Sequence, residues 1–344
     1  MSLLLTLVLA AAQPEVAWLC AASGDGDQAE LRFQRVGAEA LAPPVARFTI
    51  VPRSTVTGVL LPKSRTVLAV ALLEPAADET WAFSLLRLEA GTAPRVLVNR
   101  LAAATRPLVT GSGRVFVERG TALPAEAQLQ APHTWRRDAV SIDEVNPMSG
   151  ATRTVFSAVG FYAAIAGTLG PELFVVLVDE SGAHLDAINL ETNERRTLRA
   201  SMPPLAHDFA VDPVHGALLY TLGDARTHQW HIEALDLKTS KLRALATGPV
   251  AAMLPTVFPD GRVAFAARAG SGLTQVGSDS GRLLLGPQGP GFERVRFFHG
   301  GLALGLHERP SDFPTPLAVS LDDGAPQILL APTQMRLELA GVVP

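Results

Sequence analysis

Two patterns of turn and strand recur along the whole chain, and this repetition constrains the fold more than any other feature. In the first pattern a turn precedes a short apolar run, most clearly where Pro259, Asp260 and Gly261 precede residues 263–266. Its seven reference positions are Pro14, Ser64, Gly113, Pro171, Gly216, Gly261 and Gly301. They lie about 40 to 60 residues apart, a period typical of folds built by repeating one supersecondary unit.

The second pattern is a hairpin turn rich in Gly, Ser, Thr and Asn, which comes one strand after the first. Its markers are Gly37, Gly91, Gly150, Asn193, Ser240, Gly281 and Gly324. Nearby residues alternate between apolar and polar, as in Leu235 and Leu237 against Asp236 and Lys238, which is typical of half-buried strands. Two independent markers therefore count seven units in the same register.

Each unit contains four short strands, and four strands in roughly 45 residues is the period of a β-propeller blade. We predict an all-β fold, a seven-bladed β-propeller of four-stranded antiparallel blades, over residues 13–344. The expected blades are roughly 13–44, 45–101, 102–160, 161–202, 203–248, 249–290 and 291–332. Residues 333–344 alternate again and form a spare strand, which we expect to complete the first blade and close the ring.

The composition agrees with one large core. The chain has 344 residues, 48% of them hydrophobic, and a formal net charge of -4. This balance excludes a disordered chain and a basic nucleic-acid-binding surface. The single Cys20 excludes an internal disulfide framework and a Cys-based zinc site. Because the repeat continues through residues 150 and 250, we expect no division into two domains.

Residues 1–12 form an apolar segment that has two interpretations. About 20 apolar residues are needed to span a bilayer, so this run is too short for a transmembrane helix. Ala10 and Ala12 have the small-x-small spacing of a signal-peptidase site, which favours a signal peptide and a periplasmic or secreted protein. The alternative is a first core strand in a cytoplasmic protein, because the basic residues of a usual signal peptide are missing.

The run from Val257 to Phe265, with Pro259, Asp260 and Gly261 inside it, resembles the Pro-Asp-Gly repeat of TolB-type propellers. The same repeat occurs in the propeller domains of prolyl oligopeptidases. The resemblance implies a propeller architecture and no functional motif. Most of the other repeats lack the Asp-Gly pair, so the match is close in one unit only.

No local motif for catalysis, nucleotide binding or metal binding occurs in the sequence. The Gly-x-Ser-x-Gly of a peptidase domain is absent, and the glycine pairs lack the third glycine of a phosphate loop. His228 and His231 lie three apart, so on a strand they point to opposite faces and do not share a metal. No cofactor and no metal are therefore expected.

Polar residues precede several of the innermost strands, which line the central channel of a propeller. The strongest candidates for binding at this funnel entrance are Arg106, Tyr162, His207, Asp208, Glu293 and Arg294, with Thr55, Thr57 and Thr105 beside them. His207 and Asp208 stand out because a carboxylate fixes the tautomer and charge of a neighbouring imidazole. The alternative is a solvated rim with ordinary salt bridges.

These observations leave three hypotheses for function. The first is a non-enzymatic ligand- or protein-binding scaffold of the bacterial cell envelope, a monomer that holds a protein partner or a small polar ligand at the funnel. The second is a propeller enzyme, lactonase-like or lyase-like, with its site in the funnel. The third is a degenerate repeat protein without a small-molecule ligand.

Overall fold

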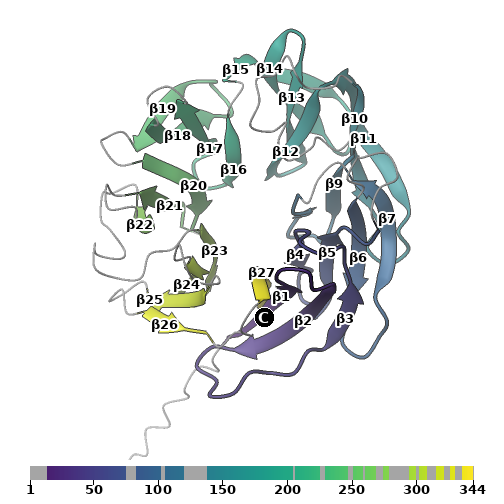
Figure 1. Cartoon of the computed structure of the whole chain (residues 1–344). Coiled ribbons are helices and arrows are strands. Elements are labelled where there is room, and N and C mark those ends of the chain that lie inside the picture. Colours follow the sequence, from purple (N-terminus) through teal and green to yellow (C-terminus); the bar gives the residue numbers. More distant parts are fainter. Residues whose placement is uncertain are drawn as a thin grey trace, which may run out of the picture.

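The computed structural model describes residues 14–74, 83–101, 105–119, 138–203, 206–224, 229–246, 251–258, 260–268, 274–278, 294–299, 302–307, 315–320, 326–329 and 335–343. Within these ranges the regular elements are β-strands, paired antiparallel in sheets that stand side by side around a common centre (Figure 1). The described residues contain no helix long and apolar enough to cross a membrane. The predicted all-β class of four-stranded antiparallel sheets is therefore confirmed.

The first sheet joins the two ends of the described chain. Its strands, in spatial order, are β27 (Met335–Val343), β1 (Glu15–Ala22), β2 (Gln28–Arg35) and β3 (Ala46–Thr49). Strand β27 takes the inner position and pairs with β1 from Glu15–Val343 to Ala22–Met335. The sheet extends past the boundary expected at residue 44, because β3 pairs with β2.

The second sheet is larger, with eight strands. Its consecutive members are β4 (Thr57–Leu60), β5 (Val67–Ala71), β6 (Phe83–Leu88), β7 (Arg95–Leu101), β8 (Leu108–Val109), β9 (Val115–Arg119), β10 (Asp138–Val145) and β11 (Thr152–Gly160). Strands β4–β7 and β8–β11 are two meanders, joined through one residue pair, Leu101 with Arg119.

The remaining strands form four sheets of consecutive strands. The next sheet contains β12 (Tyr162–Leu169), β13 (Glu172–Asp179), β14 (Gly182–Asn189) and β15 (Arg195–Met202). It is followed by β16 (His207–Asp212), β17 (Ala217–Asp224), β18 (Gln229–Asp236) and β19 (Leu242–Ala246).

The last two sheets are β20 (Ala251–Val257), β21 (Val263–Arg268) and β22 (Thr274–Ser278), then β23 (Arg294–His299), β24 (Leu302–His307), β25 (Thr315–Ser320) and β26 (Pro326–Ile328). Because the second sheet is continuous and the β20 sheet shows three strands in the described residues, seven blades remain a prediction.

The hairpin markers of the sequence occupy turns that need a left-handed backbone. The described markers are Gly37, Gly91, Gly150, Asn193 and Ser240, with φ between 56° and 79°. Glycine and asparagine adopt this conformation at low cost, which explains their recurrence at this position. In three hairpins a side-chain oxygen of Asn146, Asn189 or Asp236 also accepts backbone N–H bonds from the turn.

A polar residue lies seven positions before each of these markers, on the third strand of its meander. The set is Glu30, Ser84, Asp143, Asp186 and Glu233. Asp186 is fully buried and accepts hydrogen bonds from Arg195 and Thr197 on the outer strand, each over 2.7 Å. Asp143 accepts bonds from Thr154 over 2.8 Å and from Arg119 over 3.1 Å. Sequence analysis missed this repeated polar position.

Apolar side chains fill the spaces between neighbouring sheets. Trp18 of the first sheet packs with Leu304 of the β23–β26 sheet, and Phe174 packs in a cluster with Tyr220 of the following sheet. All four side chains are buried. Burial of such side chains contributes about 1.5 to 3 kcal/mol each, so contacts between sheets rather than within them hold the ring together.

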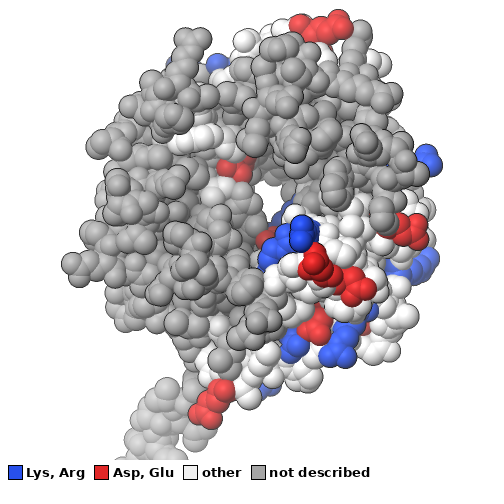
Figure 2. Space-filling model, viewed as in Figure 1, with Lys and Arg blue, Asp and Glu red and all other residues white. Residues whose placement is uncertain are grey.

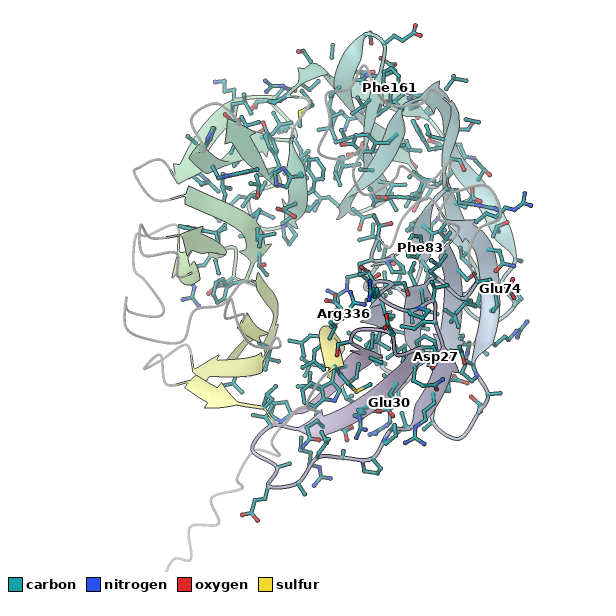
Figure 3. All side chains as sticks on the ribbon, viewed as in Figure 1. Asp27, Glu30, Glu74, Phe83, Phe161 and Arg336 are labelled. Carbon is teal, nitrogen blue, oxygen red and sulfur yellow. The ribbon has the colours of Figure 1, made fainter. Side chains whose placement is uncertain are left out.

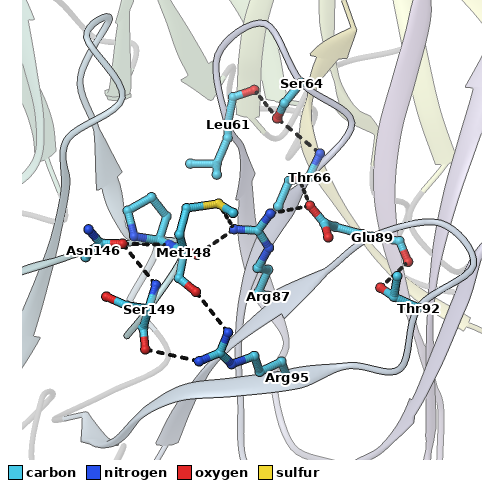
Figure 4. Close-up of polar contacts among 11 residues, drawn as sticks. Leu61, Ser64, Thr66, Arg87, Glu89, Thr92, Arg95, Asn146, Met148 and Ser149 are labelled. Atoms are coloured by element: carbon cyan, nitrogen blue, oxygen red, sulfur yellow. Dashed lines mark hydrogen bonds and ion pairs between the residues drawn. The ribbon is translucent and has the colours of Figure 1, made fainter. Parts of the chain in front are cut away.

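One boundary also carries a polar joint. Arg87 of β6 donates to the carbonyl oxygen of Pro147 over 2.8 Å, and Arg95 of β7 donates to that of Met148 over 2.9 Å (Figure 4). Arg87 also pairs with Glu89, and together with Thr66 it lowers the pKa of Glu89. The hairpin after β10 is thereby fastened to the meander β4–β7.

Candidate functional site at the channel entrance

The innermost strands run in one direction, so their first residues gather at one end of the ring. Tyr162 begins β12, His207 and Asp208 begin β16, and Arg294 begins β23. Arg106 lies just before β8. Glu293 and His228 lie outside the described residues, as do residues 1–12. Figure 2 shows basic and acidic side chains next to each other at the margin of the central opening.

Arg106 connects the backbones of two inner strands. Its Nε donates to the carbonyl oxygen of Gly58 in β4 over 2.7 Å, and its Nη2 donates to that of Leu339 in β27. Arg336 of β27, near the centre in Figure 3, donates to the carbonyl oxygen of Ser54 over 2.9 Å. These guanidinium groups therefore brace the entrance where the first sheet meets the second.

Glu118 is a half-buried carboxylic acid that sequence analysis missed. It is the last residue but one of β9, and its Oε1 accepts a hydrogen bond from the N–H of Ile165 in β12 over 2.8 Å. Burial raises the pKa of Glu118 to about 7, although the hydrogen bonds from Ile165 and Thr105 oppose the shift. Burial and the charge of Glu118 raise the pKa of Tyr162 to about 12. Thr105 and Tyr162, which the sequence predicted at the entrance, therefore lie near Glu118, which the sequence did not indicate.

β-Bulges interrupt the inner strands beside these residues. The pairing of β12 shifts between Ile165 and Gly167, that of β16 between His207 and Ala210, and that of β20 between Met253 and Thr256. In the last bulge the N–H of Leu254 donates to Oγ1 of Thr221 on the preceding sheet over 3.0 Å. This bond corresponds to that between Ile165 and Glu118. A bulge redirects side chains and leaves a backbone group unpaired, which these side chains satisfy.

His207 and Asp208 form a partly exposed pair at the entrance. Nε2 of His207 lies 3.4 Å from Oδ2 of Asp208, and the imidazole is 44% exposed against 21% for the carboxylate. Asp208 has φ 53°, a left-handed backbone that places its side chain in the bulge of β16. Trp230 of β18 meets the imidazole edge-to-face, with ring centroids 5.4 Å apart. Sequence analysis did not select Trp230, because its strand is distant from His207 along the chain.

Another histidine, His231 of β18, belongs to a separate hydrogen-bond network. Nε2 of His231 lies 3.6 Å from Oε1 of Glu233, whose Oε2 accepts a bond from the hydroxyl of Tyr220 over 2.7 Å. Burial and the bond to Glu233 raise the pKa of Tyr220 above its usual range. Across the part of the chain that the structure describes, no group of three or more His, Cys, Asp or Glu side chains has metal-binding geometry.

Comparison with known proteins gives structural matches only. No family model and no curated protein matches the sequence. TolB from Acinetobacter baumannii has a TM-score of 0.52 and 10% identity, over 95% of this chain and 66% of that chain. A prolyl endopeptidase has a TM-score of 0.58 and 10% identity, over 94% and 50%. Oligogalacturonate lyase in complex with manganese has a TM-score of 0.56 and 13% identity, over 92% and 90%.

These matches confirm the resemblance to TolB and to the propeller domains of prolyl oligopeptidase-like enzymes. At 10% to 17% identity they establish the fold of the chain, a β-propeller. The chain spans about two thirds of the TolB chain and half of the peptidase chain. The similar structures therefore include TolB, a peptidase and a lyase.

Proposed function

We propose that this chain is a non-enzymatic binding propeller of the bacterial cell envelope, which holds a segment of a partner protein at the channel entrance. The observation that carries the proposal is the group formed by His207, Asp208 and Trp230. It combines a partly exposed imidazole and a carboxylate on β16 with an indole on β18, the third strand of the same sheet. Aromatic surface with a few fixed polar groups is the usual composition of a binding site.

Other residues of the channel entrance support a preorganised site. Arg106 binds two backbone carbonyls, and Glu118 binds the backbone N–H of Ile165. Groups engaged in this way keep the entrance in one conformation, so little ordering entropy is lost when a partner binds. The Asp208 carboxylate accepts a hydrogen bond from the partner or pairs with a cationic group on it. The Trp230 ring provides an apolar or a cation–π contact.

The envelope location follows from the apolar segment before Gln13 and is in keeping with the TolB-like fold. Export is tested by expressing the full chain in a bacterium and sequencing the N-terminus of the recovered protein. Cleavage after Ala12 in a periplasmic fraction supports the proposal. Recovery of uncleaved protein in the cytoplasm contradicts the proposed location in the cell envelope. The proposed binding of a partner has a separate test.

Site-directed photocrosslinking tests the binding role. A photoreactive amino acid replaces His207 in the full chain, and a matched variant carries it at Val159, which is 55% exposed on β11. We expect a discrete crosslinked protein from position 207 and none from position 159. The same adducts from both positions, or none from position 207, would contradict the proposal.

The enzyme hypothesis provides the alternative outcome. The chain spans 90% of the length of the oligogalacturonate lyase, compared with half of the peptidase, so a propeller of this size is sufficient for catalysis. The purified unmodified protein and the His207→Ala variant are each incubated with oligogalacturonate and Mn²⁺. Turnover that the substitution abolishes would replace the binding role by a catalytic one.

A further inference from the structure

An arginine occupies the same position after the hairpin in three successive meanders. Arg153 lies opposite Glu144, Arg196 opposite Ala187, and Arg243 opposite Ala234. Each is three residues after its hairpin marker, on the outer strand of its meander. The surroundings of the three guanidinium groups can therefore be compared directly within one molecule.

In two of the three meanders the arginine binds a glutamate of its own sheet. Arg153 pairs with Glu144 over 2.7 Å, and Arg196 pairs with Glu172 over 2.7 Å. Glu144 comes from the third strand, whereas Glu172 is the first residue of the second strand, opposite Asn189. Two different positions thus supply the carboxylate.

In the β16–β19 sheet both of these positions are alanine. Ala234 replaces the glutamate of the third strand, and Ala217, opposite Asp236, replaces that of the second strand. Among the described residues the guanidinium of exposed Arg243 has no ion pair, although its two counterparts have one. This sheet therefore keeps the cation of the pattern and lacks its anion.

A cavity of about 250 Å³ lies where the missing carboxylate would be. Its wall contains Arg243 with both alanines, and its apolar lining consists of Leu219, Leu245 and Val263. The cavity is at the end of β16 opposite to His207, because it includes Asp212, the last residue of that strand. It is therefore separate from the channel entrance.

His215 and Asp212 form the remaining polar wall. Oδ1 of Asp212 accepts bonds from the N–H groups of Val214 and His215, over 2.9 and 3.0 Å, and Oδ2 lies 2.6 Å from Nδ1 of His215. The Asp212 carboxylate is thus occupied within its own turn. It fixes the imidazole at the rim of the cavity, against Gly261 of the next sheet.

We propose that this cavity binds a small aliphatic carboxylate. The carboxylate pairs with Arg243 in place of the glutamate that the other two meanders supply, and the aliphatic chain packs on Leu219, Leu245 and Val263. A guanidinium binds a carboxylate through two parallel hydrogen bonds, which gives the site its preference for acids over alcohols. The partly apolar, partly enclosed setting strengthens this pair relative to one in open water.

The test is a titration of the full chain with hexanoate, followed by NMR, with hexan-1-ol as the uncharged probe of the same length. We expect hexanoate to bind and Arg243→Gln to weaken it by about tenfold or more. Ala217→Glu places a glutamate where Glu172 lies in the preceding sheet, so it should block hexanoate while the protein stays folded. Arg196→Gln is the matched control and should bind hexanoate like the unmodified chain.

Three results would overturn the proposal. The first is an absence of hexanoate binding to the unmodified chain. The second is equal binding of hexanoate and hexan-1-ol, which would show that the Arg243 guanidinium does not contribute to binding. The third is unchanged binding of hexanoate to Arg243→Gln, a variant whose folding is checked by circular dichroism. This result is independent of how Ala217→Glu folds.

Discussion

The carboxyl group of Glu118 accepts a hydrogen bond from the backbone N–H of Ile165 over 2.8 Å, across the boundary between β9 and β12. Ile165 lies at a bulge, where the ladder leaves its N–H without a partner in the neighbouring strand. Thr221 and Leu254 repeat the arrangement two sheets further on. In both places a side chain of the second strand of one meander thus holds the inner strand of the next sheet in position at the channel.

Glu118 should make stability fall as the pH rises. Its folded-state pKa, about 7, lies above its ordinary value of 4.5, so the folded chain holds this proton more tightly than the unfolded chain does. The stabilisation is complete below pH 4.5 and is lost as the pH rises towards 7. We expect Glu118→Gln, which keeps the acceptor for Ile165, to remove a pH-dependent difference of about 1 kcal/mol or more in the free energy of unfolding.

Urea unfolding at pH 5 and pH 8 measures this difference in both proteins. Glu172→Gln serves as the control, because Glu172 lies on the sheet that contains Ile165 and pairs with an exposed arginine, Arg196, of that sheet. Equal pH dependence in Glu118→Gln and the unmodified chain would show that the carboxyl is not held protonated by its surroundings.

Glu144 should have the opposite effect in acid. Hydrogen bonds from Arg114 and Arg153 lower its pKa to about 2. Its contribution is present above the ordinary value of 4.5 and is lost as the pH falls towards 2. We expect Glu144→Gln to cost about 1 to 2 kcal/mol at pH 7 and little at pH 2, measured by thermal unfolding at both values. A cost that is the same at both pH values would contradict the ion pairing.

The polar residue of the third strand should be important for stability where it is fully buried. Asp186→Ala removes the acceptor of Arg195 and Thr197 in a fully buried setting, so we expect a loss of about 2 to 4 kcal/mol in the free energy of unfolding. Arg195→Gln should cost less, because Thr197 still donates to the Asp186 carboxylate and the Arg195 side chain is 41% exposed. Denaturant unfolding gives both values, and equal costs would refute the asymmetry.

Strand β27 should be indispensable for the first sheet. Its pairing with β1 continues from Met335 to Val343, and Leu339 and Ala340 are fully buried. Deletion of residues 334–344 removes this inner strand and exposes Trp18 and Cys20, so we expect a loss of more than about 5 kcal/mol or failure to fold. Calorimetry on the shortened chain measures this loss, and an unchanged melting temperature would contradict the closure.

The fold was accessible from the sequence because each hairpin needs a residue that tolerates a left-handed backbone. The sequence pattern marks Gly37, Gly91, Gly150, Asn193 and Ser240, and all five have a positive φ. The first unit is expected to end at roughly residue 44, and β3, residues 46–49, follows a long turn and pairs with β2. Short outer strands carry little apolar periodicity, so their ends are not visible in sequence.

The entrance was accessible only in part. Tyr162, His207 and Asp208 begin inner strands and could be found by counting back from the turns. Glu118 and Trp230 lie on other strands and reach the entrance through contacts between or across strands, which no local pattern records. The polar position seven residues before each marker was a detectable signal, and it locates Asp143, Asp186 and Glu233 without a structure.

The central claim is that the channel entrance binds a partner protein. It is tested most directly by comparing how much partner is captured from bacterial envelope extracts by variants altered at the entrance and by a variant altered elsewhere. The unmodified chain, a His207→Ala and Trp230→Ala double variant, and a His215→Ala control are immobilised in equal amounts. We predict that the double variant captures at least about tenfold less of the partner, while the His215→Ala control, altered in the turn after the far end of β16, captures as much as the unmodified chain. Equal capture by all three proteins would contradict the account.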